Sequence, residues 1–318
     1  MKNQIKVSIC VVTYNQGAYI GPCLESLLNQ CCGFEYEIII GDDASTDGTV
    51  DVIKRYASKY PQLITTILHE KNVGAFQNIL SVYKIARGKY IAHIDGDDLA
   101  AREKISLQAK VLDDNSDCCI VSHEVCLIDK NGKRIKEKYK DFPQGIYNKY
   151  DLYMNLPFFA HSSKMFRNDL KDSFWGELTD SAIDIEIHTR QVCKGNIYHI
   201  NDSLGSYRVF TGMSVNNKKI NPLLVSACHR IFQKALLDGD NKNFVKRAYA
   251  RALFKYAYQS AVLGDSDGMR LYIRKSIQLK LISAKQICFF IFSFTPGLVV
   301  LLCKLRASLR FTELKSNV

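Results

Sequence analysis

The chain has 318 residues, of which 47% are hydrophobic and 24% charged, so a folded globular protein is expected and disorder is disfavoured except at the ends. Its net charge of +11 points to an acidic partner, such as nucleic acid, anionic lipid or a phosphorylated substrate. The basic residues look scattered apart from a cluster at 130–140, and no nucleic-acid-binding signature is visible. Nucleic acid is therefore not expected as a partner.

The cysteine pattern bears on metal binding and on location. Eleven cysteines occur, with two adjacent pairs but no C-x-x-C spacing, so a zinc framework is not indicated. Many stand in apolar runs, where a thiol behaves as a small hydrophobic group. No secretory signal precedes the first apolar run, so we expect a reducing, cytoplasmic location.

The first third of the chain alternates between strand and helix patterns. Continuous apolar runs, typical of strands buried on both faces, alternate with segments whose apolar residues have helical spacing. We expect strands at 7–13, 36–40, 64–69 and 90–95, and helices at 20–29, 49–60, 75–86 and 102–112. Four strand–helix units in series predict an α/β fold with a mostly parallel central sheet, flanking helices and right-handed crossovers.

Polar side chains gather where three of these strands end. Ligands of open α/β sheets bind outside the carboxyl ends of the strands, so these residues are expected to meet at one edge. They are Thr13, Tyr14 and Asn15 after the first strand, Asp42 and Asp43 after the second, and Asp95, Asp97 and Asp98 after the fourth. Neighbouring carboxylates suit Mn²⁺ or Mg²⁺ shared with substrate phosphates. A competing interpretation is that Asp97 or Asp98 caps the next helix.

The pattern after residue 112 is less regular. We expect a strand at 118–129 followed by a turn at 130–133, a helix at 181–193 and a short strand at 196–200. Helices are expected at 223–237, 244–263 and 269–279. These expectations divide the chain into an α/β domain at 1–215 and a C-terminal helical extension at 216–318.

The end of the chain has a distinct composition. Residues 287–303 include no charged residue, are interrupted by Pro296-Gly297, and are flanked by basic residues on both sides. The run is at the short limit for a membrane-spanning helix, and the Pro-Gly pair would break one. We therefore expect a membrane-associating tail at about 285–310 that lies in the plane of the membrane. The alternative is a helical hairpin packed on the domain or on a second subunit.

Two common nucleotide-binding signatures are absent, while four other motifs occur together. There is no G-x-G-x-x-G after the first strand and no G-x-x-x-x-G-K-[ST], so phosphate would have to be held by a metal ion. The segments SICVVTYN (8–15), EIIIGDDASTDGT (37–49), NVGAFQN (72–78) and GKYIAHIDGDD (88–98) resemble, in order and spacing, the motifs of family 2 glycosyltransferases. The resemblance is strong over the first 110 residues and weaker to about residue 214.

This resemblance implies a GT-A fold, a nucleotide-sugar donor, with a UDP-sugar favoured, and roles for individual residues. One of Asp42 and Asp43 would accept a hydrogen bond from the nucleotide base, and Asp43 is favoured. The other implied roles are a base pocket lined by Thr13, Tyr14 and Asn15, ribose or metal contact by Asp95, and direct binding of Mn²⁺ or Mg²⁺ by Asp97. Arg208, in a Tyr-Arg segment that precedes a loop at 211–214, would pair with the diphosphate or form a structural ion pair.

An inverting transfer also requires a general base opposite the leaving group. The resemblance places Asp184 at this position, although Ile183 stands where the family has a Glu. Asp180 and Glu186 are the alternatives, and helical spacing would put Asp180 and Asp184 on one face. His161 could border the acceptor site, although a structural role is the alternative.

The resulting hypothesis is an inverting, metal-dependent glycosyltransferase that moves a sugar onto a glycan or lipid-linked acceptor. It would act in surface polysaccharide synthesis at the cytosolic face of a membrane. One alternative is a nucleotide-sugar-binding protein without activity. Another is a metal-dependent nucleotidyl- or phosphotransferase, which is disfavoured because no glycine-rich phosphate loop stands beside the acids. Trp175 could stack on a sugar or belong to the core.

Overall fold

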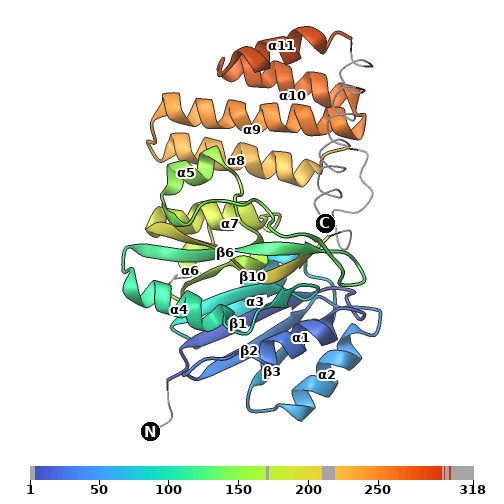
Figure 1. Ribbon diagram of the computed structural model, residues 1–318, viewed down its shortest axis with the longest axis vertical. Helices are drawn as coiled ribbons and strands as arrows, with labels where there is room; N and C mark the ends of the chain where they lie inside the picture. Colours follow the sequence, from blue (N-terminus) through green and yellow to red (C-terminus); the bar gives the residue numbers. More distant parts are fainter. Residues whose placement is uncertain (1–3, 170–171, 210–218, 296, 298–300, 302–318) are drawn as a thin grey trace. The chain divides into compact units, whose positions relative to one another are not determined.

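Apolar runs form the strands at the centre of the fold (Figure 1). The computed structural model describes residues 4–169, 172–209, 219–295, 297 and 301. Within these residues the strands are β1 Val7–Thr13, β2 Tyr36–Asp42, β3 Ile64–Leu68, β4 Tyr90–Asp95, β5 Leu99–Ala100, β6 Cys118–Ile128, β7 Arg134–Lys136, β8 Gly145–Tyr147, β9 Met165–Arg167 and β10 Asn196–Arg208. They form one mixed sheet in the order β3-β2-β1-β4-β9-β6-β10-β5, with β7 beside β6 and β8 beside β10.

The first half of the sheet is parallel, as the sequence predicts. β1 lies between β2 and β4 and is parallel to both, and β3 continues the parallel order beside β2. The connecting helices are α1 Ile20–Leu28, α2 Thr49–Lys59, α3 Ala75–Lys84 and α4 Lys104–Asp114. α3 packs on β1 and β2, and α4 packs on β6 and β9. The predicted α/β fold with flanking helices is confirmed, and the helix ends differ from the expected ones by one or two residues.

The second half departs from the parallel pattern. β9 is antiparallel to both β4 and β6, whereas β10 is parallel to β6. The predicted short strand at 196–200 is wrong, because β10 continues to Arg208. Register shifts within the β10–β6 pairing interrupt the alternation of inward and outward side chains, which hides the second part of the strand in the sequence.

The helix predicted at 181–193 is shorter than expected. It consists of α7, Asp184–Gln191, followed by a 3₁₀ turn at Val192–Lys194. Asp180 lies in the turn before α7, so the predicted shared helix face of Asp180 and Asp184 is wrong. The remaining helices of this part are the short α5, Lys149–Met154, and α6, Asp172–Trp175.

The described residues form two compact units. One unit contains the sheet and runs to Lys149 and again from Pro157 to Val209; the other contains Tyr150–Leu156 and the described residues from Lys219 onward. The short segment Tyr150–Leu156 therefore groups with the helices, although no boundary was predicted there. Its Tyr150 hydroxyl donates to Asp240 at 3.0 Å, and its Tyr153 ring packs edge-on against Phe232.

The second unit is built from well-capped helices: α8 Pro222–Leu237, α9 Lys242–Leu263, α10 Ser266–Leu279 and α11 Ala284–Phe292. Asn221, Asn241, Asp265 and Ser283 each accept a hydrogen bond from the backbone of the helix that they precede. Gly264 ends α9 in the left-handed conformation, which costs glycine little. Inside the unit, Ser276 donates to the carbonyl of Ala250 and accepts from Gln286, which joins α9, α10 and α11.

Two expectations fall on residues that are not described. The loop at 211–214 lies outside the described residues, and so do 296, 298–300 and 302–318 of the predicted tail. The described part of the tail includes α11, which ends at Phe292, well before the end of the uncharged run at 287–303. Among the helices of the described ranges, none combines the length and the apolar character needed to cross a membrane.

Candidate functional site

The polar ends of three strands meet at one edge of the sheet, as the sequence predicts. In the strand register, Thr13 at the end of β1 stands beside Asp42 of β2, and Val12 stands beside Asp95 of β4. The residues directly after β2 and β4 are held to β1, because the amides of Asp43 and Gly96 donate to the carbonyls of Thr13 and Val12. A side chain at Gly96 would collide with Thr13 and Gln16. The acidic segment therefore lies directly against β1.

A network of short hydrogen bonds shapes the loops after β1 and β2. Asp42 is fully buried, and its carboxylate accepts from the amide and hydroxyl of Ser45. The Ser45 hydroxyl also accepts from the amide of Asn15 at 2.8 Å, and Oδ1 of Asn15 accepts from the amide of Thr46 at 2.8 Å. Asn15 has a positive φ of 52°, which asparagine tolerates better than most residues. The tight loop leaves the neighbouring Tyr14 half exposed.

Asp43, the favoured partner of the nucleotide base, has structural contacts of its own. Its two carboxylate oxygens accept from the backbone amides of Val73 and Gly74, at 2.6 and 3.1 Å. Asp43 therefore ties the loop after β3 to the end of β2. Each carboxylate oxygen has two lone pairs, so these bonds leave acceptor capacity. The nucleotide-binding roles of Thr13, Tyr14, Asn15, Asp42 and Asp43 remain predictions.

Asp95 is fixed from two sides. Oγ of Ser162 donates to Oδ2 of Asp95 at 3.1 Å and accepts from the Asp95 amide at 2.9 Å. Nε2 of His93 lies 3.2 Å from Oδ1, and the hydroxyl of Tyr83 lies 2.8 Å from Nδ1 of His93. Burial lowers the pKa of His93, although Asp95 opposes the shift, so the ring is neutral near pH 7. A carboxylate only accepts, so Nε2 donates to Asp95 and Nδ1 accepts from Tyr83.

Asp98 does not cap the following helix. The strand β5 comes directly after it, and the N-cap of α4 is Glu103. Instead, Oδ1 of the buried Asp98 accepts from the backbone amide of Arg208 at 2.8 Å. Burial raises the pKa of Asp98 well above its usual range, and the charges of Asp95 and Asp97 raise it further. The interpretation of Asp98 as a helix cap is therefore wrong.

The acidic segment can be compared with what a divalent cation requires. Three carboxylates stand within four residues, and Oδ2 of Asp98 is buried with no hydrogen-bond partner among the described residues. The described part of the chain contains no group of three or more His, Cys, Asp or Glu side chains that could hold a metal ion by themselves. Mg²⁺ is typically bound by one or two carboxylates together with substrate phosphates. The donor set of Asp95 and Asp97 fits that type of site.

Arg208 holds the acidic segment through its backbone and its side chain. Nε donates to the carbonyl of Asp97 at 2.9 Å, and Nη1 donates to the carbonyl of Asp129 at 2.8 Å. The guanidinium lies over the ring of Tyr19, 4.7 Å from its centroid. These contacts make Arg208 a positioning residue for Asp97 and Asp98. Its predicted contact with a diphosphate remains a prediction.

Asp184 is the first residue of α7 and lies within electrostatic range of the acidic segment. Burial raises its pKa, and the negative charge of Asp95 adds to the shift, whereas the amide of Ile185 and the charge of Lys164 oppose it. A carboxyl group with a raised pKa is better suited to accept a proton near neutral pH than an ordinary aspartate. Asp184 therefore combines a raised pKa with a place within electrostatic range of Asp95.

The two alternative bases have other contacts. Oε2 of Glu186 accepts from the amide of Ile183 at 3.2 Å, which satisfies a donor at the start of α7. Oδ1 of the exposed Asp180 accepts from the side-chain amide of Gln77 at 2.6 Å. Each of the three carboxylates thus accepts a hydrogen bond, and the assignment of the base to Asp184 remains a prediction.

Sequence reasoning missed a buried cluster of cations and histidines behind the acids. Lys104 donates to the carbonyl of Ser162, and Lys164 donates to Gln191 at 3.1 Å. Burial lowers the pKa of each lysine to about 7, although Asp98 supports the charge of Lys104 and Asp184 that of Lys164. The signal for such residues is a charged side chain beside an apolar strand, as in Lys164 before β9.

His161 belongs to this cluster, and its place beside the acceptor site remains a prediction. Its ring lies against that of His93, with centroids 3.8 Å apart, and its Nδ1 lies 2.9 Å from Nε2 of His188. Burial lowers the pKa of both His161 and His188 well below the usual range, and the nearby Lys164 and His93 side chains lower it further. His161 thus supports the position of His93, which in turn donates to Asp95.

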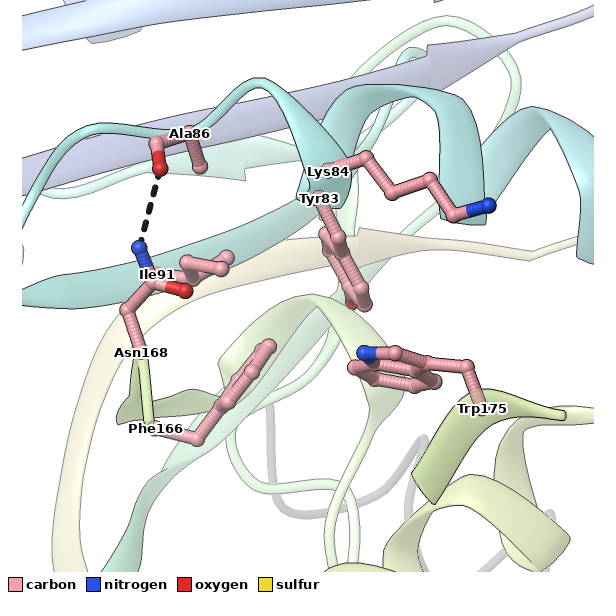
Figure 2. A pocket seen from close by; sticks show the side chains of 7 residues that line it. All are labelled: Tyr83, Lys84, Ala86, Ile91, Phe166, Asn168 and Trp175. Atoms are coloured by element: carbon pink, nitrogen blue, oxygen red, sulfur yellow. Dashed lines mark hydrogen bonds between the residues drawn. The ribbon is translucent and has the colours of Figure 1, made fainter. Parts of the chain in front are cut away.

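Trp175 lines a cavity in the unit that contains the sheet, with a volume of about 290 Å³ (Figure 2). The centroids of the Trp175 and Tyr83 rings are 5.6 Å apart, and the Tyr83 ring in turn packs edge-on against Phe166. Asn168 closes another side by donating to the carbonyl of Ala86 at 2.9 Å. Trp175 is almost completely buried, so its contacts are those of a core residue. Stacking of Trp175 on a sugar remains a prediction.

The sheet and its polar edge define a class of protein. It is an α/β protein whose strand ends bring polar and acidic side chains together at one edge of the sheet, the edge at which ligands of open α/β sheets bind. The chain belongs to glycosyl transferase family 2, whose model matches residues 8–174.

Similar proteins support the same assignment. Uncharacterized protein Rv1520 of Mycobacterium tuberculosis is 31% identical over 208 residues, which cover 64% of this chain and 58% of that protein. Putative glycosyltransferase EpsH of Bacillus subtilis is 28% identical over 290 residues, covering 89% of this chain and 76% of EpsH. The crystal structure of S. aureus TarS 1-349 in complex with UDP has a TM-score of 0.64 at 16% identity, with 94% of this chain and 89% of that chain covered. The predicted GT-A-like fold is thereby confirmed.

Proposed function

We propose that this protein is an inverting, metal-dependent glycosyltransferase. It moves a sugar from a nucleotide-diphosphate donor, with UDP favoured, to a hydroxyl of a glycan or lipid-linked acceptor in surface polysaccharide synthesis. The observation that carries the proposal is the meeting of Thr13, Asp42 and Asp95 at one edge of the sheet, with Asp184 within electrostatic range. Family membership and the UDP named for TarS support the choice of donor.

The proposed chemistry is a single displacement. The acceptor oxygen attacks the anomeric carbon and forms the new glycosidic bond while the bond from that carbon to the diphosphate oxygen breaks. Asp184 takes the proton of the acceptor hydroxyl, and the nucleoside diphosphate leaves with the bonding electron pair. Asp184 needs its carboxylate form at that moment, and the neighbouring Lys164 charge favours this form.

A bound Mn²⁺ or Mg²⁺, held by Asp97 with Asp95, would supply Lewis-acid stabilisation of the departing diphosphate. The protein's own contribution is to keep these two carboxylates in place. Ser162 and His93 hold Asp95, and Arg208 holds the backbone of Asp97. Such supporting contacts keep metal ligands in a fixed orientation.

A donor screen tests the function directly. We expect one nucleotide sugar, among UDP-, GDP- and dTDP-linked sugars, to be hydrolysed slowly in the presence of Mn²⁺, and hydrolysis to stop when EDTA is added. Stabilisation by a nucleotide sugar without any hydrolysis or transfer would favour the non-catalytic alternative. Release of a nucleoside monophosphate or of inorganic phosphate as the first product would favour a nucleotidyl- or phosphotransferase.

We further propose that the C-terminal end of the chain contacts the cytosolic face of a membrane. α11 and the residues after it expose apolar side chains, namely Ile287, Ile291, Phe292 and Phe294. Ile287 and Ile291 are four residues apart and share a helix face. Lys285 lies in the first turn of the same helix, so apolar burial and attraction to anionic headgroups would act together.

Flotation with liposomes tests this contact. We expect the full-length protein to float with anionic liposomes and Ile291→Glu to reduce the bound fraction several-fold, because a carboxylate is costly among acyl chains. Leu237→Glu is the matched control, since Leu237 is an exposed leucine at the end of α8. Equal flotation of wild type and both variants, or no flotation of any, would contradict the proposal and favour protein packing of the tail.

A further inference from the structure

The positive charge of the chain is concentrated in its last third. Residues 216–318 contain 18 of the 43 Lys and Arg residues but only 5 of the 32 Asp and Glu residues. Residues 1–215 contain 25 basic and 27 acidic residues, so the part that includes the acidic edge of the sheet has no positive excess. The interpretation of the basic residues as scattered is wrong. The net charge of +11 therefore indicates an anionic ligand that binds to the helical unit rather than to the donor site.

The helical unit contains a groove of about 600 Å³ that is lined by α8, α9 and α10. On each helix the lining residues recur at helical spacing, so that one face of each contributes. Leu253 belongs to the apolar part of the lining and is almost completely buried. The volume is within the range of pockets that hold small ligands.

Two tyrosines form a fixed wall of this groove. The Tyr249 ring stacks on Phe232 with centroids 5.0 Å apart and an interplanar angle of 21°. Tyr272 packs edge-on against Tyr256, at 6.0 Å. Because both rings are held by aromatic neighbours, they are pre-organised rather than free to rotate. Aromatic rings held in this way present an apolar face beside a polar hydroxyl, which suits the mixed surface of a sugar or polyol.

Cationic and hydrogen-bonding groups complete the lining. Arg230 of α8 and Lys275 of α10 both line the groove, together with Gln278. His229 is oriented by Tyr249, whose hydroxyl lies 3.0 Å from Nδ1. Nδ1 is thereby engaged, and Nε2 is the ring nitrogen that a ligand would meet. Guanidinium and ammonium groups beside aromatic rings are the groups that recognise phosphate on a carbohydrate.

We propose that this groove binds a phosphate-bearing saccharide or polyol, as a holding site for the acceptor chain. The role as an acceptor site rests on the proposed glycosyltransferase function, whereas the binding itself does not. Arg230 and Lys275 pair with the phosphate, and the tyrosine wall contacts the carbon skeleton. The apolar side chains of α11 are a separate feature and take no part in this site.

Isothermal titration of the full-length protein tests the site with glucose 6-phosphate as the probe. Glucose and inorganic phosphate are the matched controls for the ligand. We expect glucose 6-phosphate to bind more tightly than either control, and Lys275→Gln to weaken its binding about tenfold, the effect of losing one charge-assisted hydrogen bond. Arg274→Gln removes the same charge from the adjacent residue, which does not line the groove, and should leave binding unchanged.

Three results would overturn the proposal. Equal affinity for inorganic phosphate and glucose 6-phosphate would show that only an anion is bound. An equal loss in Lys275→Gln and Arg274→Gln would show diffuse attraction without a site. Binding to phosphatidylglycerol vesicles that depends on Lys275, with none to glucose 6-phosphate, would assign the groove to a lipid headgroup. A parallel titration with UDP and Mn²⁺ separates the two proposals, because its failure in the wild type would count against the donor site alone.

Discussion

Asp97→Ala is expected to abolish metal-dependent binding of the donor nucleotide. The substitution removes the carboxylate proposed to bind Mn²⁺ directly, so the affinity for UDP in the presence of Mn²⁺ should fall by more than about 100-fold, since even supporting residues of metal sites cost 10–100-fold. Isothermal titration with UDP, with and without Mn²⁺, measures the effect. Equal affinities of wild type and variant would contradict the metal assignment.

The same variant should keep its fold. Asp97 raises the pKa of the buried Asp98, so the two charges repel one another in the protein without metal. Removing one of them relieves this repulsion, and the melting temperature without metal should therefore stay equal or rise. Asp114→Ala is a suitable control, because Asp114 is exposed and pairs only at the surface with Lys110. This control should change neither UDP binding nor stability appreciably.

The Asp184→Asn variant is expected to lose sugar-transfer activity while it keeps its affinity for the donor nucleotide. A general base contributes on the order of 10² to 10⁴-fold in rate, so the turnover number should fall by that factor. The affinity for UDP should barely change, because the base acts on the acceptor. Steady-state transfer kinetics and UDP titration on the same preparation measure the two effects. Asp180→Asn and Glu186→Gln are the matched controls, and loss of transfer in one of them alone would move the base there.

The raised pKa of Asp184 adds two further readouts. The base must be ionised, so wild-type transfer should decline as the pH falls through this raised pKa, at a higher pH than for an ordinary aspartate. The Asn variant should lack this decline. The fold favours the protonated form of Asp184, so its ionised form lowers stability at neutral pH. Asp184→Asn should therefore not lower the melting temperature, and a clear decrease would indicate a structural role instead.

The local sequence determined the first half of the fold and the ends of its strands. β1 and β4 have the predicted bounds, because an apolar run bounded by polar residues leaves few alternatives for a buried parallel strand. The meeting of Thr13, Asp42 and Asp95 followed from the parallel order alone. The positive charge of the helical unit can also be counted from the sequence. Only the folded structure shows that Arg230 and Lys275 line a groove.

Tertiary packing decided the rest. β10 continues to Arg208 because β6 supplies partners through two irregularities, which no local pattern encodes. Asp98 accepts from Arg208, 110 residues away, instead of capping the next helix. Burial, which depends on the whole folded chain, lowers the pKa of Lys164 to about 7, although the charge of Asp184 opposes this shift. The sequence by itself was enough to identify the acidic residues of the candidate site. Packing between distant segments determined their hydrogen-bond partners and their protonation, because both depend on which groups are removed from water together.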